Sequence, residues 1–388
     1  MSLSVSISSN LNKNTTLMPV YSNIQLIAVD PAANNYLFYI GVNDVSTYEY
    51  SIQQGYNNTC SINLSTVLEG IFTTDVSFNT NNYFSNQNAI KKITWEVISR
   101  DINLNTLNVY NGFNTTNPLY VYNGVISPDE EPYFKNPLSF FPNASQGYWL
   151  RKHKAPIKIL NYAPGNNIGD EHWLSSFNGN FGDCSCNITQ LKLTSYKFNG
   201  TVSSSTASLS LADKSIWSVN VNKSSLTSMF GPSYVDINTN YCVLQDASSY
   251  LQPVTIQLIT QNKINNPYNI LYTNSLGVPE CVLFDRVDEK GVTMARNTYG
   301  YYLEKVYYTQ IDRQYSVYSS LMRQEDSLSL FDLWISPVVY AENDEFVVPQ
   351  PVIITDTQQL IANRWNVDKV LQYKINLSCA YRTLVQRV

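Results

Sequence analysis

Short apolar runs with a period of two recur along the chain and constrain its fold more than any other feature. They include residues 24–29, 36–42, 93–99, 190–198 and 254–259, and turn signals such as Asp-Pro, Asn-Asn and Asn-Gly separate many of the runs. Alternation of this kind puts one face of a strand into a core and the other into solvent. The pattern predicts an all-β protein: two to three antiparallel β-sandwich modules of immunoglobulin-like size in series, with a few short helices.

Helical signals are few. Residues 64–71 carry apolar side chains at helical spacing, Ser65 can cap a helix, and Gly70 lies near its stop. Residues 325–333 are a second short candidate, whereas the serine run at residues 203–206 is typical of a loop. We therefore expect at most two or three helices.

One stretch, YNILYTNSLGVPECVLF at residues 268–284, predicts a hairpin or a tight corner between two strands. Its turn contains Asn274, Ser275 and Gly277, and Pro279 fixes the exit. These residue types serve turn geometry before they serve catalysis. We interpret the stretch as a structural corner that begins the last β module.

The clearest break in the strand pattern is SPDEEPYFKNPLSFFP at residues 127–142, which holds four prolines and a short acidic run. Its aromatic side chains need a surface to pack on, so we expect a long surface loop or a connection between domains. The predicted organisation is an arm at 1–16, a β-sandwich at 17–128, a connecting loop at 129–156, a second β module at 157–264 and a third at 265–388.

Charged residues make up only 14% of the chain, against about 25% in typical soluble domains. The polar surface must come from amide and hydroxyl side chains and from the 29 tyrosines, which suit β surfaces and protein contacts. A net charge of −5 and a single short basic cluster at residues 151–154 argue against nucleic-acid binding.

The chain has no run of 18 or more apolar residues, so the sequence predicts no membrane span. Its first residues have neither a basic region nor a continuous apolar one, which predicts no signal peptide. We therefore expect the six cysteines to be reduced and buried. Cys184 and Cys186 are the one close pair, and they lack the second pair that a zinc site needs. We predict no metal and no cofactor.

Candidate catalytic groups are sparse. Only two histidines are present: His153 lies in the basic cluster, and His172 follows Asp170 and Glu171. The Asp170-Glu171-His172 triplet is the best acid–base or metal candidate, but adjacent residues seldom face one site. The acidic run at residues 129–131 is more typical of a solvated loop than of a glycosidase pair, and known catalytic fingerprints are absent. The sequence favours a protein that is not an enzyme.

Three aromatic residues are candidates for binding. Tyr148, Trp149 and Trp173 lie near asparagine and aspartate side chains, so they could stack on sugars or anchor a subunit contact.

Several segments resemble tail, baseplate or neck-type virion structural proteins of tailed bacteriophages, especially those of Bacteroidota hosts. Residues 19–24, 36–42 and 64–75 are similar to the amino-terminal module of such proteins. The stretch at 268–284, Thr298-Tyr-Gly, and residues 333–340 and 352–356 are similar to the carboxy-terminal portion. The shared motifs are turn and strand signatures rather than reactive residues.

The resemblance implies a virion location after synthesis in the host cytoplasm, self-association into a threefold or sixfold ring, and contacts with other virion proteins. We expect residues 1–16 and 127–142 to make intersubunit contacts. The alternative is a glycan-binding adhesin or receptor-binding module of the virion. A remote third possibility is a glycan depolymerase that uses Asp170, Glu171 and His172.

Overall fold

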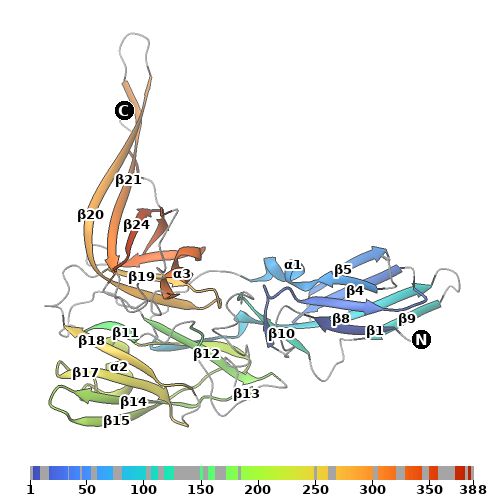
Figure 1. Ribbon diagram of the computed structural model, residues 1–388, viewed down its shortest axis with the longest axis horizontal. Coiled ribbons are helices and arrows are strands. Elements are labelled where there is room, and N and C mark those ends of the chain that lie inside the picture. Colours follow the sequence, from blue (N-terminus) through green and yellow to red (C-terminus); the bar gives the residue numbers. More distant parts are fainter. Residues whose placement is uncertain are drawn as a thin grey trace, which may run out of the picture.

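The computed structural model describes residues 3–8, 17–33, 35–43, 46–53, 59–72, 81–101, 106–111, 118–125, 149–151, 156–161, 172–181, 185–248, 251–260, 268–299, 305–319, 328–342, 349–356, 372–380 and 383–385. Within these ranges the fold is mostly β, with several sheets and three α-helices. The prediction of a β protein with a few short helices is confirmed. Figure 1 shows two units of packed sheets and a barrel that carries a long arm.

The N-terminal unit consists of two sheets with an apolar core between them. The smaller sheet has the order β1 (Ser4–Ser8), β3 (Gln25–Val29), β6 (Thr59–Asn63). The larger has the order β2 (Leu17–Pro19), β10 (Leu119–Tyr122), β8 (Ile90–Asp101), β4 (Asn35–Val42), β5 (Ser46–Gln53), with β9 (Thr106–Asn111) beside β8. Burial alternates along β3 and β4, which is why the period-two pattern located both strands.

The middle unit also consists of two sheets around one core. Its larger sheet has the order β11 (Ile157–Asn161), β18 (Val254–Thr260), β17 (Thr239–Asp246), β14 (Gln190–Lys197), β15 (Val202–Ser208). The other has the order β13 (Ser185–Cys186), β12 (Trp173–Asn180), β16 (Ser215–Asn220), β7 (Tyr83–Asn86). The predicted loop at residues 203–206 is wrong, because β15 runs through it as a strand at the edge of the sheet.

Strand β7 crosses from one unit to the other. It pairs antiparallel with β16, and the ring of Phe84 meets the edge of Trp173 at a centroid distance of 5.2 Å. The turn η2 (Gln87–Ala89) then leads into β8 of the N-terminal unit. Residues 83–86 therefore belong to a sheet of the middle unit, although the sequence assigns them to the module at 17–128. The correction has a physical reason: a strand of four residues carries no local signal of which sheet it joins.

The two units share one connectivity. In the larger sheet of each unit, a short first strand lies parallel to the unit's last strand: β2 beside β10 in the N-terminal unit, and β11 beside β18 in the middle unit. Beyond that pair, the N-terminal sheet continues with β8, β4 and β5, and the middle sheet with β17, β14 and β15. A helical segment follows the corresponding strand of the other sheet: α1 (Leu64–Leu68) and η1 (Glu69–Ile71) after β6, and α2 (Lys223–Phe230) after β16. The helix predicted at residues 64–71 is confirmed, and the structural repeat was not visible in the sequence.

The third unit is a closed β-barrel of six strands rather than a sandwich, which corrects the predicted third module. The ring runs β20 (Pro279–Tyr299), β19 (Tyr268–Thr273), β22 (Val339–Glu342), β23 (Gln350–Ile354), β24 (Lys374–Cys379), β21 (Lys305–Ser319), and β20–β21 pairing closes it. In a closed barrel every strand has a hydrogen-bonded neighbour on both of its edges, and the β20–β21 pair supplies the last of these contacts. Helix α3 (Leu328–Ile335) packs against the barrel core, and β25 (Thr383–Val385) pairs with β21.

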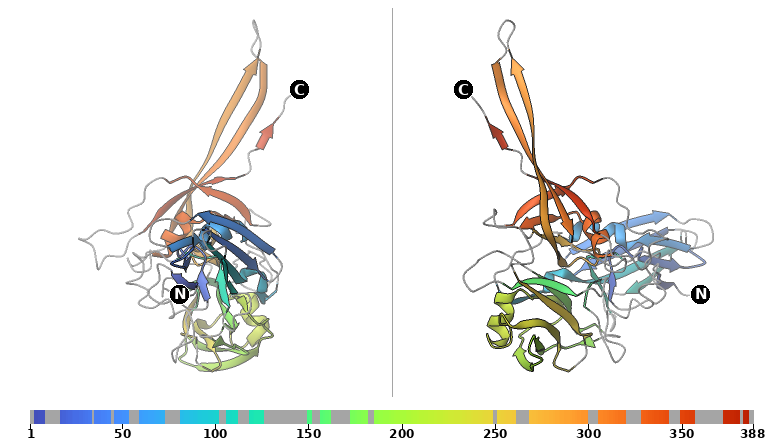
Figure 2. Two further views of the ribbon diagram at one scale, coloured as in Figure 1. Left: turned by 90° about the vertical axis from the view of Figure 1, so that its right-hand side faces the viewer. Right: turned by 60° about the vertical axis from the view of Figure 1, so that its left-hand side comes forward.

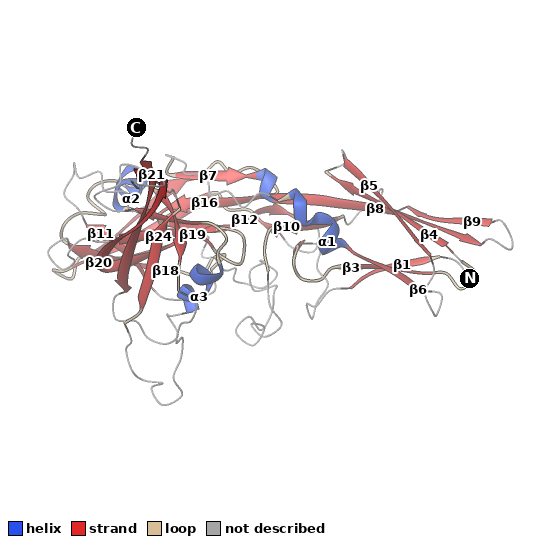
Figure 3. Ribbon diagram, turned by 90° about the horizontal axis from the view of Figure 1, so that it is seen from above, coloured by secondary structure: helices blue, strands red, loops and turns tan. Residues whose placement is uncertain are grey.

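The barrel lies against the middle unit, and the N-terminal unit extends to one side (Figures 1 and 3). Beyond the barrel, β20 and β21 continue together as a two-stranded arm that projects far from the rest of the molecule (Figure 2). An additional apolar cluster joins the three units, with members from the N-terminal sheet, the middle unit and the β19–β20 turn. The arm and this junction are the two features that bear on function.

Candidate functional site

The junction is organised by the turn that connects β19 to β20. The Asn274 side chain is 3% exposed, and its oxygen accepts hydrogen bonds from the backbone N–H groups of Leu276 and Val278. Its amide nitrogen donates to the Leu150 carbonyl at 2.9 Å and to Glu280 Oε2 at 2.9 Å. One asparagine thus fixes the turn and ties it to the middle unit. The predicted hairpin at residues 268–284 is confirmed.

At Gly277 the backbone of the N-terminal unit lies too close to allow any side chain. Its φ is +76°, a region that favours glycine, and a Cβ added there would lie 1.4 Å from the carbonyl oxygen of Asn123 in the N-terminal unit. Gly124 faces the same turn, because a Cβ on it would lie 3.2 Å from the Leu276 carbonyl oxygen. Two backbones therefore touch directly at this point.

Further contacts bind the turn to its surroundings. The Val125 N–H donates to the Ser275 carbonyl at 2.7 Å, and Ser275 Oγ donates to the buried Asp332 of α3 at 3.1 Å. Leu276 and Val278 are fully or almost fully buried in the apolar cluster shared by the three units. The sequence identified the corner but not its partners, which come from segments that lie 57 residues or more away along the chain.

A buried polar cluster lies beside the turn. Arg151 Nε is 3.8 Å from Glu280 Oε1, and both side chains are at most 10% exposed. His172 lines the same cavity of about 10 Å³, which is room for one water molecule at most. Burial, with a smaller effect from the Arg151 charge, lowers the pKa of His172 to about 3. The imidazole is therefore neutral at pH 7, and its Nε2 has no hydrogen-bond partner among the described residues.

The predicted aromatic site residues do not meet at a surface. Trp149 is 3% exposed, packs edge-on against Trp217 and donates from Nε1 to the Gln252 carbonyl. Trp173 is 4% exposed and lies beside Phe84. Both indoles are therefore parts of the interior and offer no ring face for stacking. Tyr148 lies outside the described residues, as do Asp170, Glu171 and His153.

The described cysteines are free, and they are buried or half-buried. Burial raises the pKa of Cys186 to about 12 and that of Cys242 to about 11, so both thiols are protonated at neutral pH. Cys184 lies outside the described residues. Within the described part of the chain, no group of three or more His, Cys, Asp or Glu side chains could hold a metal ion.

The arm is a two-stranded ribbon whose two edges differ. Pairing between β20 and β21 runs from Phe284 to Tyr299 on β20, with bulges near both ends and a regular ladder over residues 289–297. On the far side of β21, β24 pairs with residues 314–318 and β25 with residues 309–311. On the far side of β20, β19 pairs only as far as Phe284. Among the described residues, the β20 edge of the arm has no strand beside it.

A polar groove of about 440 Å³ lies at the foot of the arm, between β21 and β24. Ser316 Oγ donates to Asn376 Oδ1 at 2.6 Å, and Asp356 accepts from the backbone and the side-chain amide of Asn376. These hydrogen bonds join β21, β24 and the segment after β23.

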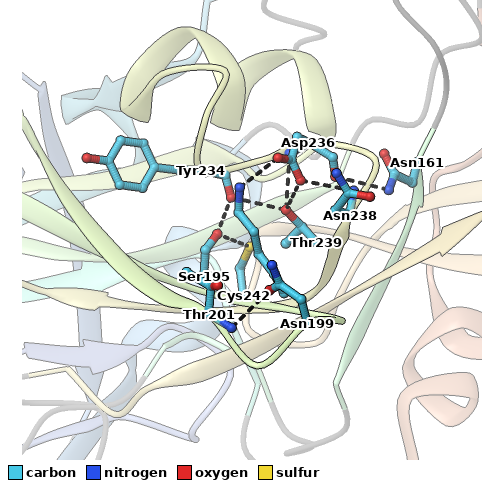
Figure 4. A network of polar contacts seen from close by, with 10 residues as sticks. Asn161, Ser195, Asn199, Thr201, Tyr234, Asp236, Asn238, Thr239 and Cys242 are labelled. Atoms are coloured by element: carbon cyan, nitrogen blue, oxygen red, sulfur yellow. Dashed lines mark hydrogen bonds and ion pairs between the residues drawn. The ribbon is translucent and has the colours of Figure 1, made fainter.

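A second exposed feature lies at one end of the middle unit, where a polar network fixes the loop before β17 (Figure 4). Asp236 accepts from Lys197 Nζ at 2.7 Å, from Thr239 Oγ1 at 3.0 Å and from the Asn238 N–H at 2.9 Å. Burial raises the pKa of Asp236, but these hydrogen bonds outweigh it, so the pKa lies below the ordinary aspartate value. The network holds the loop in one conformation.

This fixed loop presents apolar side chains to solvent. Ile237 is 73% exposed, and Phe198, at 63%, donates its backbone N–H to the Asn238 carbonyl of the same loop. Val202, at the start of β15, is also more than half exposed. Scattered apolar residues are normal on surfaces, but Ile237 and Phe198 lie on two loops that a backbone hydrogen bond joins, and Val202 begins the strand that follows Phe198. We call these three residues the apolar tip.

No protein-family model matches this chain, and neither does any curated protein to which it was compared. None of the described helices has the length and apolarity that crossing a bilayer requires.

Proposed function

We propose that the protein is a structural subunit of a tailed-phage virion, in the tail, baseplate or neck, and that it works by self-assembly and contacts with neighbouring virion proteins. The observation that carries the proposal is the arm, a long ribbon that projects from the body and whose β20 edge has no strand beside it among the described residues (Figure 2). Open edges promote strand addition, and soluble proteins usually block or cover them. A ring of three or six copies is the expected assembly.

The rigid junction supports the same proposal. A subunit that transmits load between neighbours needs its parts fixed relative to one another, and the Asn274 turn ties all three units together through hydrogen bonds and a shared apolar cluster. In this proposal, the first two units are immunoglobulin-like modules. Their strand order, with a short parallel first strand beside the last strand, supports that topology.

Glycan binding by a virion adhesin is the second candidate. The apolar tip favours it more than the residues that the sequence singled out, because exposed Phe198 lies next to Asn199 at the turn of a hairpin. Aromatic rings with neighbouring amides are suited to sugars. A glycan array would test this role, with Phe198→Ala as the variant expected to lose any signal.

The assembly role is tested by measuring the mass of the purified chain over a wide concentration range, by sedimentation and native mass spectrometry. We expect discrete oligomers, and electron micrographs that show rings with threefold or sixfold symmetry. The protein should also co-sediment with phage particles. A chain that remains a monomer at high concentration and never co-sediments with particles would contradict the proposal.

A further inference from the structure

Two residues, Leu150 and Arg151, connect the middle unit to the barrel. The Leu150 N–H donates to the Ser175 carbonyl of β12 at 2.8 Å, and the Leu150 carbonyl accepts from the Asn274 amide of the barrel turn at 2.9 Å. Arg151 Nε lies 3.8 Å from Glu280 Oε1 of β20. We call Leu150 and Arg151 the strap, because they bridge the two units with three polar contacts.

The strap and His172 line one cavity. His172 directly precedes β12, and its side chain is buried. Glu280 and Cys281 of β20 form part of the opposite wall, on the barrel side. With a volume of about 10 Å³, the cavity has room for one water molecule at most. The imidazole therefore acquires a shell of water only if a wall of the cavity moves away.

The charges around the cavity disfavour a further positive charge. Burial, and then the Arg151 charge, lower the pKa of His172 to about 3, so the imidazole is neutral at pH 7. Glu280 is the one acid among the described residues that line the cavity, but its carboxylate contacts Arg151 and accepts from the Asn274 amide at 2.9 Å. The carboxylate that could balance an imidazolium is thus engaged by other partners.

The remaining described groups around the cavity offer no balancing charge. Tyr272 of β19 pairs with Glu280 in the sheet, and burial, followed by the Glu280 charge, raises its pKa well above the ordinary value, so it stays neutral. Asp170 and Glu171 precede His172 in the chain and lie outside the described residues. The other described lining residues of β11, β12 and β20 supply apolar side chains, a hydroxyl and a thiol: Ile157, Trp173, Leu174, Ser175, Pro279 and Cys281.

Protonation of His172 is compatible with an open strap rather than a closed one. An imidazolium carries an N–H donor on each ring nitrogen, and Nε2 of His172 has no hydrogen-bond partner among the described residues. A buried charge without partners is costly, and like charges repel strongly where water is scarce. We infer that acid releases the strap from the contact between the middle unit and the barrel, while the apolar cores of both units stay folded. This inference goes beyond the proposed virion role and does not depend on it.

The strap is the weakest part of its surroundings. Trp149, the residue before it, is held separately, because its ring packs on Trp217 and its Nε1 donates to the Gln252 carbonyl. The cores of the middle unit and the barrel are built from many buried apolar side chains. The apolar cluster around the β19–β20 turn contains no group that takes up a proton in acid, so the units remain joined there. Leu150 is itself buried, which keeps the strap closed at neutral pH.

Hydrogen exchange of the full chain, resolved to single amides, tests the release. The reporter is the Leu150 N–H, whose bond to Ser175 breaks when the strap opens. Because the pKa of His172 is about 3 in the closed contact and ordinarily 6.5, one proton is taken up on opening between these values. After correction for the intrinsic exchange rate, we expect protection of this amide to fall about tenfold per pH unit between pH 6 and pH 4. Amides in β14, β17, β21 and β24 should keep their protection.

Two variants separate His172 from other groups that titrate in acid. His172→Gln cannot take up the proton, so protection of the Leu150 N–H should no longer depend on pH. His153→Gln replaces the other of the two histidines and should keep the response of the parent chain. Circular dichroism and thermal melting should show that both variants are folded at pH 7.

Nuclear magnetic resonance gives a measurement that does not need the His172 variant to fold. In the His153→Gln chain, His172 supplies the one histidine signal, and its protonated form should appear in step with the loss of protection at Leu150. Protonation near pH 6.5 with unchanged protection at Leu150 would overturn the inference, because the closed contact would then accommodate the charge. An equal pH response in the parent and His172→Gln, or a parallel loss of protection in the core strands, would also overturn it.

Discussion

Strand β20 has an inner and an outer half, and the two differ in which strands hydrogen-bond to their backbone. Its first six residues lie inside the barrel wall, paired with β19, and begin directly after the Asn274 turn. Its outer half pairs with β21 alone and leaves one edge open in the described structure. One continuous strand thus forms part of the closed barrel at one end and part of the two-stranded arm at the other.

Because of this difference, we expect substitutions in the inner half to change folding stability and substitutions in the outer half to change the proposed assembly. In the inner half, Glu280, Leu283 and Phe284 are buried within the chain, so a substitution there should act on folding. The outer half lies outside the barrel wall, so in the proposed assembly a substitution there should act on contacts between subunits more than on folding. The predictions below test the inner half and its surroundings, in order of decreasing expected effect.

Gly277→Ala should have the largest effect. The new Cβ would meet the Asn123 carbonyl oxygen at 1.4 Å, in a backbone conformation with φ +76°. Because the obstacle is backbone, the two units would have to separate, and we expect a loss of at least about 3 kcal/mol in the free energy of unfolding. Denaturant titration measures it.

Gly200→Ala is the matched control, because its φ is +82° but a Cβ there would meet nothing within 4 Å. Its free energy of unfolding should fall only by the cost of placing a Cβ in this backbone conformation, about 1–2 kcal/mol. Equal losses in the two variants would show that the contact between Gly277 and Asn123 is not what holds the units together.

Asn274→Ala should come next. The substitution removes the donor to Leu150 and Glu280 and the acceptor for two backbone N–H groups, all in a buried site. Buried groups left without partners cost more than the bond itself, so we expect a loss of about 2–3 kcal/mol. In the control Asn199→Ala, the lost bond to the Thr201 N–H is exposed, and the loss should stay below about 1 kcal/mol. Thermal unfolding with calorimetry distinguishes the two outcomes.

The sequence predicted strands that pack on a core better than strands at sheet edges or in the arm. Strands with one buried face, such as β3 and β4, were predicted correctly because burial imposes alternation on their residues. Strand β15 was taken for a loop because it lies at a sheet edge, where serines satisfy its exposed positions. The arm segment at residues 285–298 was missed for a related reason, since a ribbon outside the core needs no apolar face.

The junction was only partly predictable. Asn274, Ser275 and Gly277 were assigned to a turn on local grounds, and the structure confirms the turn. Their contacts to Asn123, Leu150 and Asp332 depend on tertiary packing, which no local pattern encodes. Closure of the barrel was invisible for the same reason, because it rests on pairing between strands that are distant in the sequence. Trp149 and Trp173 were proposed as binding residues, and the structure places both in the interior.

A pH titration should show a moderate effect from His172. Its pKa in the folded state is about 3, below the ordinary value of 6.5, so the unfolded chain binds a proton that the folded chain excludes. Stability from this residue is therefore complete above pH 6.5 and falls as the pH decreases towards 3, by up to about 1.4 kcal/mol per pH unit. We expect His172→Gln to lack this contribution. Parallel stability curves for parent and variant between pH 7 and pH 4 would contradict it.

The smallest effect is expected away from the junction, at the Asp236–Lys197 pair that fixes the loop of the apolar tip (Figure 4). Because both side chains keep contact with solvent, a double-mutant cycle of Asp236→Asn and Lys197→Met should give a coupling free energy of only about 0.5–1 kcal/mol. The pKa of Asp236 is lowered, so the coupling should be present at neutral pH and disappear as the pH falls through that pKa. A coupling as large as the loss in Asn274→Ala would mean that the middle unit depends on this loop as strongly as the molecule depends on its junction.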